Sequence, residues 1–228
     1  MLGDEKMITE SKPWDWRMVK GKYEDKWRMP SQEVYYLINR WHQEGMKSVL
    51  DLGCGIGRHS ILFSQEGFKT YALDLSENAV TRAKQWSNEC GLDIDFKVGD
   101  MLDLPYDNEM MDAIFAYYAI SHTDTKGVIK ILKQINRVLK SQGEVYLTLG
   151  SKDSWGFQEN WPVVDENTKI RIEDGPDNNV PHFYADSKLI FELFNDFDIL
   201  DLKQIQKIEM VNNQIKNHHH YHVLAKKR

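Results

Sequence analysis

The chain has 228 residues, of which 41% are hydrophobic and 28% charged, with a formal net charge of −6 and a pI near 5.8. This length is enough to bury a full hydrophobic core, and no stretch approaches the ~20 apolar residues of a membrane span. The acidic balance gives no general attraction to phosphate backbones, so we do not expect nucleic acid as a partner.

Residues 1–30 begin without the basic-then-apolar pattern of a signal peptide, so we expect a cytoplasmic protein. This segment contains four aromatic residues among many charges and without clean periodicity, namely Trp14, Trp16, Tyr23 and Trp27. Two interpretations stay open. The rings anchor the N-terminus to the sheet edge, or the segment is a lid over a bound ligand.

A helix is expected next. Ser31 suits its N-cap position, and apolar residues follow at helical spacing, namely Val34, Leu37, Ile38 and Trp41. The apolar face of this helix should pack on a sheet.

The segment VLDLGCGIGRHS, residues 49–60, combines a buried strand, a glycine turn and a helix start. Gly53, Gly55 and Gly57 leave no Cβ where the chain reverses. Their G-x-G-x-G spacing differs from the G-x-G-x-x-G dinucleotide fingerprint, which argues against NAD or FAD. The carboxylate of Asp51 before the turn would repel a pyrophosphate and attract a cationic amino-acid group. The loop therefore predicts a site for a cofactor that carries an amino-acid group.

Further strands follow the loop. The run KTYALDLS ends a strand at Asp74, 21 residues after Gly53, where a carboxylate can accept both hydroxyls of a ribose. The run IDFKVGD ends at Asp100, just before Met101, and MDAIFAYY forms a fourth strand.

Helices are expected between these strands, at about 58–66, 77–90 and 125–140. A stop at 141–143 precedes a fifth strand, EVYLTLG. This alternation predicts right-handed crossovers and a parallel sheet covered on both faces.

Taken together, the motifs in residues 31–150 resemble the class I S-adenosylmethionine (SAM) methyltransferases, and the layout is similar to their type-11 and tellurite-resistance-like groups. The segment RVLKSQG before the fifth strand adds to the resemblance. It implies one α/β methyltransferase domain over 1–228, with a three-layer, Rossmann-like, seven-stranded sheet. The implied sheet is mostly parallel with an antiparallel strand 7, in the order 3-2-1-4-5-7-6.

The resemblance also implies SAM as cofactor and S-adenosylhomocysteine as product. The residues it assigns to cofactor binding are Asp51, Gly53, Gly55, Asp74, Leu75, Asp100, Met101 and Tyr117. Arg58 and His59 either contact the SAM carboxylate or only solvate the helix end, and their role stays open.

Residues 151–185 form a long insert with three prolines, several acids and a single short strand-like run, TKIRI. Such an insert after the fifth strand is expected to cover the ligand crevice. A helix over 186–195 and strands near 198–209 and 220–225 complete the sheet.

Candidate catalytic residues on the acceptor side are Tyr118 and His122, which follow the fourth strand, and His182 in the insert. For His122 the alternative is an ordinary loop histidine bonded to backbone. His218, His220 and His222 would share one strand face, and a metal site with His182 can be drawn. A polar edge-strand face explains the same residues, so no metal is expected.

The expected reaction is in-line transfer of a methyl group from SAM to a small-molecule acceptor. It needs no covalent intermediate, and it needs a general base only when the acceptor is protonated. The alternatives are a protein or tRNA methyltransferase and a non-catalytic SAM-binding module. We expect no membrane association and a monomer or homodimer.

Overall fold

The computed structural model describes residues 11–211 and 213–228, so the first ten residues of the predicted 1–30 segment lie outside the described part. The described helices are η1 (Trp16–Met18), α1 (Lys22–Arg28), α2 (Glu33–Gln43), α3 (Arg58–Gln65), α4 (Glu77–Glu89), α5 (Thr125–Val138), α6 (Trp155–Gln158) and α7 (Ser187–Leu193). The strands are β1 (Ser48–Leu52), β2 (Lys69–Asp74), β3 (Ile94–Val98), β4 (Met111–Ala116), β5 (Leu139–Ser151), β6 (Val163–Asp165), β7 (Thr168–Ile170), β8 (Pro181–Ala185), β9 (Phe197–Val211) and β10 (Gln214–Lys227).

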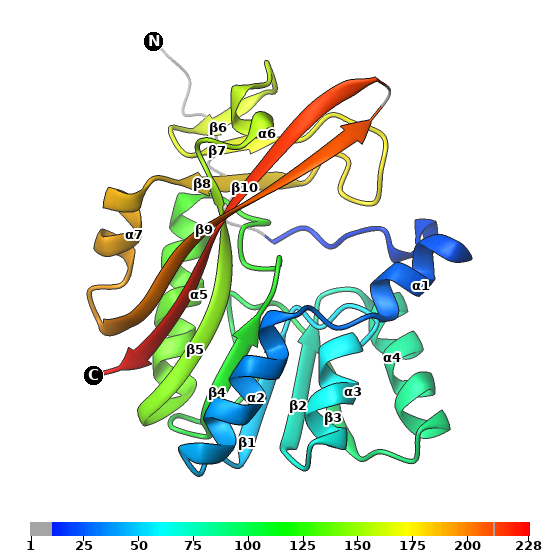
Figure 1. Ribbon diagram of the computed structural model, residues 1–228, viewed down its shortest axis with the longest axis vertical. Coiled ribbons are helices and arrows are strands. Elements are labelled where there is room, and N and C mark those ends of the chain that lie inside the picture. The colour runs from blue at the N-terminus through cyan, green and yellow to red at the C-terminus, as the bar shows by residue number, and fades with distance from the viewer. Residues whose placement is uncertain (1–10, 212) are drawn as a thin grey trace.

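The main sheet confirms the predicted topology (Figure 1). Strands β3, β2, β1, β4 and β5 pair in that order and run parallel. β10 pairs antiparallel with β5, and β9 pairs antiparallel with β10. Counting β9 as strand 6 and β10 as strand 7 gives the order 3-2-1-4-5-7-6.

The insert contains three strands: β7 lies in the predicted strand-like run TKIRI, whereas β6 and β8 were not predicted. β8 pairs in parallel with Gly150 and Ser151, at the end of β5, and β7 and β6 extend from it. Gly150 already pairs with β10 on one edge, so β8 must take the other edge, above the end of β4. The insert thereby lies over the carboxyl ends of the central strands.

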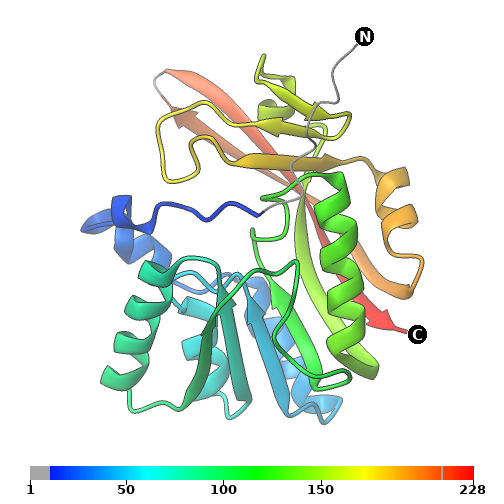
Figure 2. The same ribbon diagram turned by 180° about the vertical axis from the view of Figure 1, so that it is seen from behind.

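Helices cover both faces of the sheet, as predicted (Figures 1 and 2). On one face α2 and α3 bury Trp41 and Phe63 against β1 and β4, with α4 beside them. On the other face α5 and α7 bury Ile131 and Ile190 in the largest apolar cluster. None of the described helices is long and apolar enough to cross a membrane.

Two local predictions were wrong. Helix α2 has Gln32 at its N-cap, and the Ser31 hydroxyl, although buried, has no hydrogen-bond partner among the described residues. The predicted stop at 141–143 lies inside β5, because the register to β4 shifts there and absorbs the extra residues as a bulge. The positive φ of Gln142, 63°, marks that bulge.

The described part of the N-terminal segment crosses above the sheet, between α1 and the insert strands (Figure 1). Its backbone is hydrogen-bonded to the insert and to the loop after β4. The N–H of Asp15 donates to the carbonyl of Pro176 at 2.7 Å, and the N–H of Lys12 donates to the carbonyl of His122 at 3.4 Å. The guanidinium of Arg82, on α4, holds the carbonyls of Trp16 and Val19 at 2.8 and 3.1 Å. This segment is therefore bonded to α4, to the insert and to the loop after β4.

Candidate active site

The glycine loop between β1 and α3 needs its glycines for two reasons. Gly53, Gly55 and Gly57 have φ of +74°, +55° and +92°, a region that side chains disfavour. A Cβ would also collide with neighbours, with Ala119 at Gly53 and with the ring of Trp16, 2.5 Å away, at Gly55. The loop is thus shaped by packing within the protein as well as by room for a ligand.

Asp74 ties the end of β2 to this loop. Its Oδ2 accepts the N–H of Gly55 and its Oδ1 the N–H of Ser76, each at 2.8 Å. Burial raises the pKa of the Asp74 carboxyl, and these backbone bonds oppose the shift. Each oxygen keeps a further lone pair, so the carboxylate fits the ribose hydroxyls expected from the motif.

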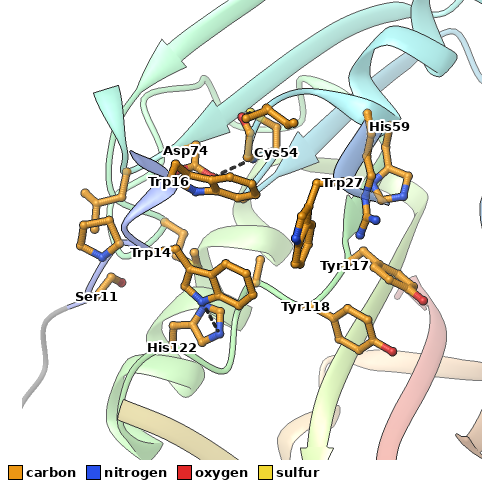
Figure 3. A pocket seen from close by; sticks show the side chains of 18 of the residues that line it. Ser11, Trp14, Trp16, Trp27, Cys54, His59, Asp74, Tyr117, Tyr118 and His122 are labelled. Atoms are coloured by element: carbon orange, nitrogen blue, oxygen red, sulfur yellow. Dashed lines mark hydrogen bonds between the residues drawn. The ribbon is translucent and has the colours of Figure 1, made fainter. Parts of the chain in front are cut away.

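A first cavity opens at the carboxyl ends of β1, β2 and β4 (Figure 3). Six of the residues assigned to the cofactor line it, namely Gly53, Gly55, Asp74, Leu75, Met101 and Tyr117. The remaining two, Asp51 and Asp100, do not line it.

Asp51 lies beneath the glycine loop and is 1% exposed. The Ser60 hydroxyl donates to its Oδ2 at 2.5 Å, and burial raises the pKa of the carboxyl to about 7. Asp100 has a local role, since its Oδ1 accepts the N–H of Leu102 at 2.9 Å. Asp51 is thus positioned to act on a ligand through its charge and not through contact.

Tryptophans from the N-terminal segment close the first cavity (Figure 3). The ring of Trp16 is buried over Gly55, and Trp14 meets Trp27 edge-on with ring centroids 5.1 Å apart. The indole N–H of Trp14 donates to Nε2 of His122 at 3.3 Å. A neutral His122 therefore carries its proton on Nδ1.

A second cavity of about 770 Å³ adjoins the first. The two share six lining residues: Trp14, Trp27, Arg58, Tyr117, Tyr118 and His122. The insert supplies much of the remaining wall, including Trp155, Trp161, Arg171 and Tyr184. A ligand in the first cavity and another in the second would meet at the shared residues.

The three candidate catalytic residues all line this second cavity. The rings of His122 and His182 are 5.1 Å apart, and Oδ2 of Asp177 lies 3.6 Å from Nε2 of His182. Burial lowers the pKa of each imidazole to about 3, so both are neutral at pH 7. The structure shows no backbone bond to the His122 ring, whose partner is Trp14. Neutral imidazoles can donate or accept a hydrogen bond here but are weak bases.

Tyr118 has a strained backbone, with φ of 54°, and its N–H donates to the Thr148 hydroxyl at 2.7 Å. Its ring meets that of His220 with centroids 4.6 Å apart. Burial raises the pKa of the Tyr118 phenol and lowers that of His220 to about 3. Tyr118 is therefore a protonated hydroxyl donor at neutral pH.

The β10 histidines bond to other side chains. Nδ1 of His218 accepts the Trp155 indole N–H at 3.2 Å, and Nδ1 of His222 pairs with the Tyr146 hydroxyl at 2.6 Å. Within the described part of the chain, no group of three or more His, Cys, Asp or Glu side chains is arranged to hold a metal ion.

The residues flanking the glycine loop differ in environment. Nε2 of His59 accepts the N–H of Ser31 at 3.1 Å, and the side chain is 4% exposed, so it holds the chain entering α2. Arg58 lines both cavities. Arg171, Asp177 and Trp155 carry no motif in the sequence, and the density of aromatic and charged residues in the insert is the only signal for them.

Comparison with known proteins assigns the class. Residues 49–143 match the family described as "Methyltransferase domain". With the sheet order and the loop, this match identifies residues 49–143 as a class I SAM-dependent methyltransferase domain, as the sequence predicted, and supports SAM as the cofactor.

Individual relatives agree with this class. A sarcosine/dimethylglycine N-methyltransferase of Halorhodospira halochloris is 34% identical over 44% of this chain and 36% of its own length. A SAM-dependent methyltransferase of Methanosarcina mazei superposes with a TM-score of 0.70, at 20% identity, covering 84% of this chain and 96% of its own. A 1,6-didemethyltoxoflavin-N1-methyltransferase of Burkholderia thailandensis, solved with bound 1,6-didemethyltoxoflavin and S-adenosylhomocysteine, superposes with a TM-score of 0.65 at 16% identity. The superposition covers 93% of this chain and 85% of that one.

The matching part of this chain spans less than half the length of the curated relatives it resembles, from 22% to 49% for the first three. The structural likenesses are below 25% identity and show the fold alone.

Proposed function

We propose that this protein transfers a methyl group from SAM to a small-molecule acceptor. One observation carries the proposal: the cavity lined by the motif's cofactor residues shares a wall with a second cavity large enough for a small molecule. The two ligands would meet beside Tyr117, Tyr118 and His122.

The residues around the first cavity suit SAM. Asp74 offers carboxylate oxygens to the ribose, Leu75 and Met101 offer apolar contacts to the adenine, and Gly53 leaves backbone space for the amino-acid part. The ionised form of Asp51 below the loop would favour the cofactor's ammonium group. SAM supplies a methyl carbon whose bond to sulfur breaks as the acceptor attacks, and sulfur keeps the electron pair to give S-adenosylhomocysteine.

The chain's own contribution would be positioning and exclusion of water. Holding two reactants in line can supply about 7–11 kcal/mol of the barrier. His182, His122 and Tyr118 would orient the acceptor, with Tyr118 donating a hydrogen bond. We further propose that residues 11–30 act as a lid on this single domain, and that the 151–185 insert covers the acceptor side.

Two alternatives make different predictions. A protein or tRNA methyltransferase should expose its acceptor site to a macromolecule, whereas here tryptophans and the insert line the second cavity. A non-catalytic SAM-binding module would bind cofactor without turnover. The cytoplasmic location and the monomeric or dimeric state stay predictions from the sequence.

Turnover is tested by incubating the pure protein with SAM and a panel of thiol, amine, hydroxyl, carboxylate and chalcogen-anion acceptors, and measuring release of S-adenosylhomocysteine. We expect release above the no-acceptor background with at least one class. His182→Gln and Tyr118→Phe should then slow turnover while leaving SAM affinity unchanged. SAM binding without release from any class would favour the non-catalytic module.

A further inference from the structure

Arg58 carries a positive charge that forms no ion pair within the described part of the chain, although the carboxylates of Asp51 and Glu33 act on it from a greater distance. It lies where the two cavities meet, and its Nη1 donates only to the backbone carbonyl of Met29, at 3.2 Å. Across residues 11–211 and 213–228, no carboxylate oxygen lies within 4.0 Å of its guanidinium. Three other partly buried arginines, Arg40, Arg82 and Arg171, contact carboxylates at 2.6, 2.8 and 2.8 Å. Arg137 has no carboxylate within 4.0 Å among the described residues, but it donates to two backbone carbonyls and two side-chain amide oxygens.

The surroundings of Arg58 are apolar rings. Its guanidinium carbon lies 5.0 Å from the ring centroid of Trp27 and 5.6 Å from that of Tyr117. Burial lowers the pKa of the Arg58 guanidinium, which shows that the charge is poorly solvated. A partly buried charge without a direct ion-pair partner is unfavourable, and the two rings offset only part of this cost. A ligand that brings a negative charge into contact with Arg58 is therefore bound more strongly.

The larger cavity also contains N–H donors without acceptors. The Nε1–H of Trp27 and the Nε–H of Arg171 are buried and have no hydrogen-bond partner among the described residues. The hydroxyl of Ser31 and Nε2 of His182 are unpaired as well, and each can donate. Three carboxylates line the cavity: Asp177 and Glu209 are paired with Arg171 and Lys207, and Asp174 is exposed to solvent. The unmet need of the cavity is therefore for hydrogen-bond acceptors.

The aromatic walls of the cavity favour a flat ligand. Indole rings come from both sides, Trp14 and Trp27 from the N-terminal segment and Trp155 and Trp161 from the insert. Ring faces of this kind stack on planar molecules. The histidines of the cavity are poor bases, since burial lowers the pKa of His122, His182 and His220 to about 3. An acceptor that arrives already deprotonated needs no base.

We propose that the methyl acceptor is a planar aromatic or heteroaromatic anion, whose carboxylate or ring oxyanion is bound by Arg58 and by the Trp27 indole N–H. This inference rests on the proposed methyltransferase function, because it names the acceptor class of the same site. An acidic group on an aromatic ring satisfies the unpaired charge, the unpaired donors and the ring-lined walls together.

The test uses two probes of equal shape, 2-naphthoate and the uncharged 2-naphthamide, titrated calorimetrically into the full-length protein with and without S-adenosylhomocysteine. We expect the wild type to bind naphthoate about tenfold or more tightly than naphthamide. Arg58→Met should abolish this preference, and Arg58→Lys, which keeps the charge, should retain part of it. Trp27→Phe, which removes only the N–H, should weaken naphthoate more than naphthamide.

The matched control is Arg17→Met, which removes an exposed arginine that lines neither cavity and should keep the wild-type preference. Thermal unfolding establishes that each variant is folded. Equal binding of the two probes by the wild type, or an unchanged preference in folded Arg58→Met, overturns the proposal.

The carboxylate of SAM is a second anionic group that Arg58 could bind in place of the acceptor's. Titrations with S-adenosylhomocysteine and with 5′-methylthioadenosine, which lacks the amino-acid part, show whether Arg58 binds the cofactor's carboxylate or the acceptor's. If Arg58→Met weakens only S-adenosylhomocysteine and leaves the naphthoate preference intact, Arg58 binds the cofactor and the proposal is wrong. If the wild type does not bind S-adenosylhomocysteine at all, the proposed function fails, while the cofactor-free probe titration still decides the anion preference.

Discussion

Asp74 serves both the loop and the cofactor cavity, because its two oxygens hold backbone N–H groups while the side chain faces the ligand space. We expect Asp74→Ala to weaken SAM binding by about 1–3 kcal/mol, the range for a hydrogen bond to a charged group. Isothermal titration measures the change. Asp103 is exposed in the loop after β3, and the control variant Asp103→Ala should bind SAM with the affinity of the wild type. Wild-type affinity in a folded Asp74→Ala protein would contradict the assignment.

Asp51 makes SAM binding dependent on pH. Burial raises the pKa of its carboxyl to about 7, so it is partly protonated at neutral pH without ligand. A cationic cofactor nearby favours the ionised form, so binding should release protons and tighten from about pH 6 to 8. Titrations at pH 7 in buffers of different ionisation enthalpy measure the release. Asp51→Asn should remove it, and equal heats for the wild type in all buffers would exclude this coupling.

At the scale of elements, the ring of Trp16 packs the N-terminal segment onto Gly55 of the glycine loop, in addition to the segment's bonds to α4, the insert and the loop after β4. A Cβ at Gly55 meets the Trp16 ring before it reaches the space of the cofactor. We therefore expect Gly55→Ala to displace residues 14–19. Trypsin should then cut at Lys20 and Lys22 about tenfold faster, since local opening controls cleavage.

Gly67→Ala is the control for that experiment. Gly67 has a similar left-handed φ, +85°, but open space around its Cβ position. The substitution should cost about 1–2 kcal/mol of stability through backbone strain and leave the N-terminal segment protected. Equal proteolysis of the two variants would show that the Trp16 contact does not hold the segment.

Most of the sheet could be predicted because its strands are short apolar runs separated by glycine turns and amphipathic helices, as in β1, α3 and β2. The strands of the insert could not be predicted with the same clarity, because β6 and β7 have three residues each, too few to show a hydrophobic period. β9 matches the predicted range 198–209 to within two residues at each end. β10 begins six residues before the predicted 220–225, because its outer part, Gln214 to His219, is mostly polar and resembles loop sequence.

The cofactor side of the site was predictable for the same local reason: the motif and its cavity residues lie within one β-α-β unit and its neighbours. The acceptor side was only partly so. The contact of Trp14 with His122 joins residues 108 positions apart. The pairing of Arg171 with Asp177 depends on the fold of the insert, and the hydrophobic pattern of the sequence does not predict that fold.

For the whole molecule, the buried histidines predict sensitivity to acid. The pKa of His122, His182 and His220 falls to about 3 in the folded state, below the usual value of 6.5. The unfolded chain therefore binds more protons between these values, and stability present above about pH 6.5 is lost as the pH falls toward 3. The raised pKa values of Asp51, Asp74 and Asp124 act in the opposite direction. The lowered pKa values of three further histidines, His59, His218 and His222, add to the loss of stability in acid.

We accordingly expect Tm to fall between pH 7 and pH 4, by about 2–4 °C for each kcal/mol lost. The Tm of His182→Gln should fall less between pH 7 and pH 4 than that of the wild type. His42→Gln, at an exposed histidine on α2, should follow the wild type. Calorimetric scans across the pH series measure this, and parallel curves for the wild type and His182→Gln would contradict the account.

The central claim is that the cavity at the glycine loop binds SAM, and isothermal titration of the pure protein with SAM tests it most directly. The account predicts one site per chain, with a dissociation constant between about 1 μM and 1 mM, the usual range for enzyme ligands. It also predicts competition by S-adenosylhomocysteine and a loss of affinity in Asp74→Ala. Absence of SAM binding by the folded protein would contradict the account.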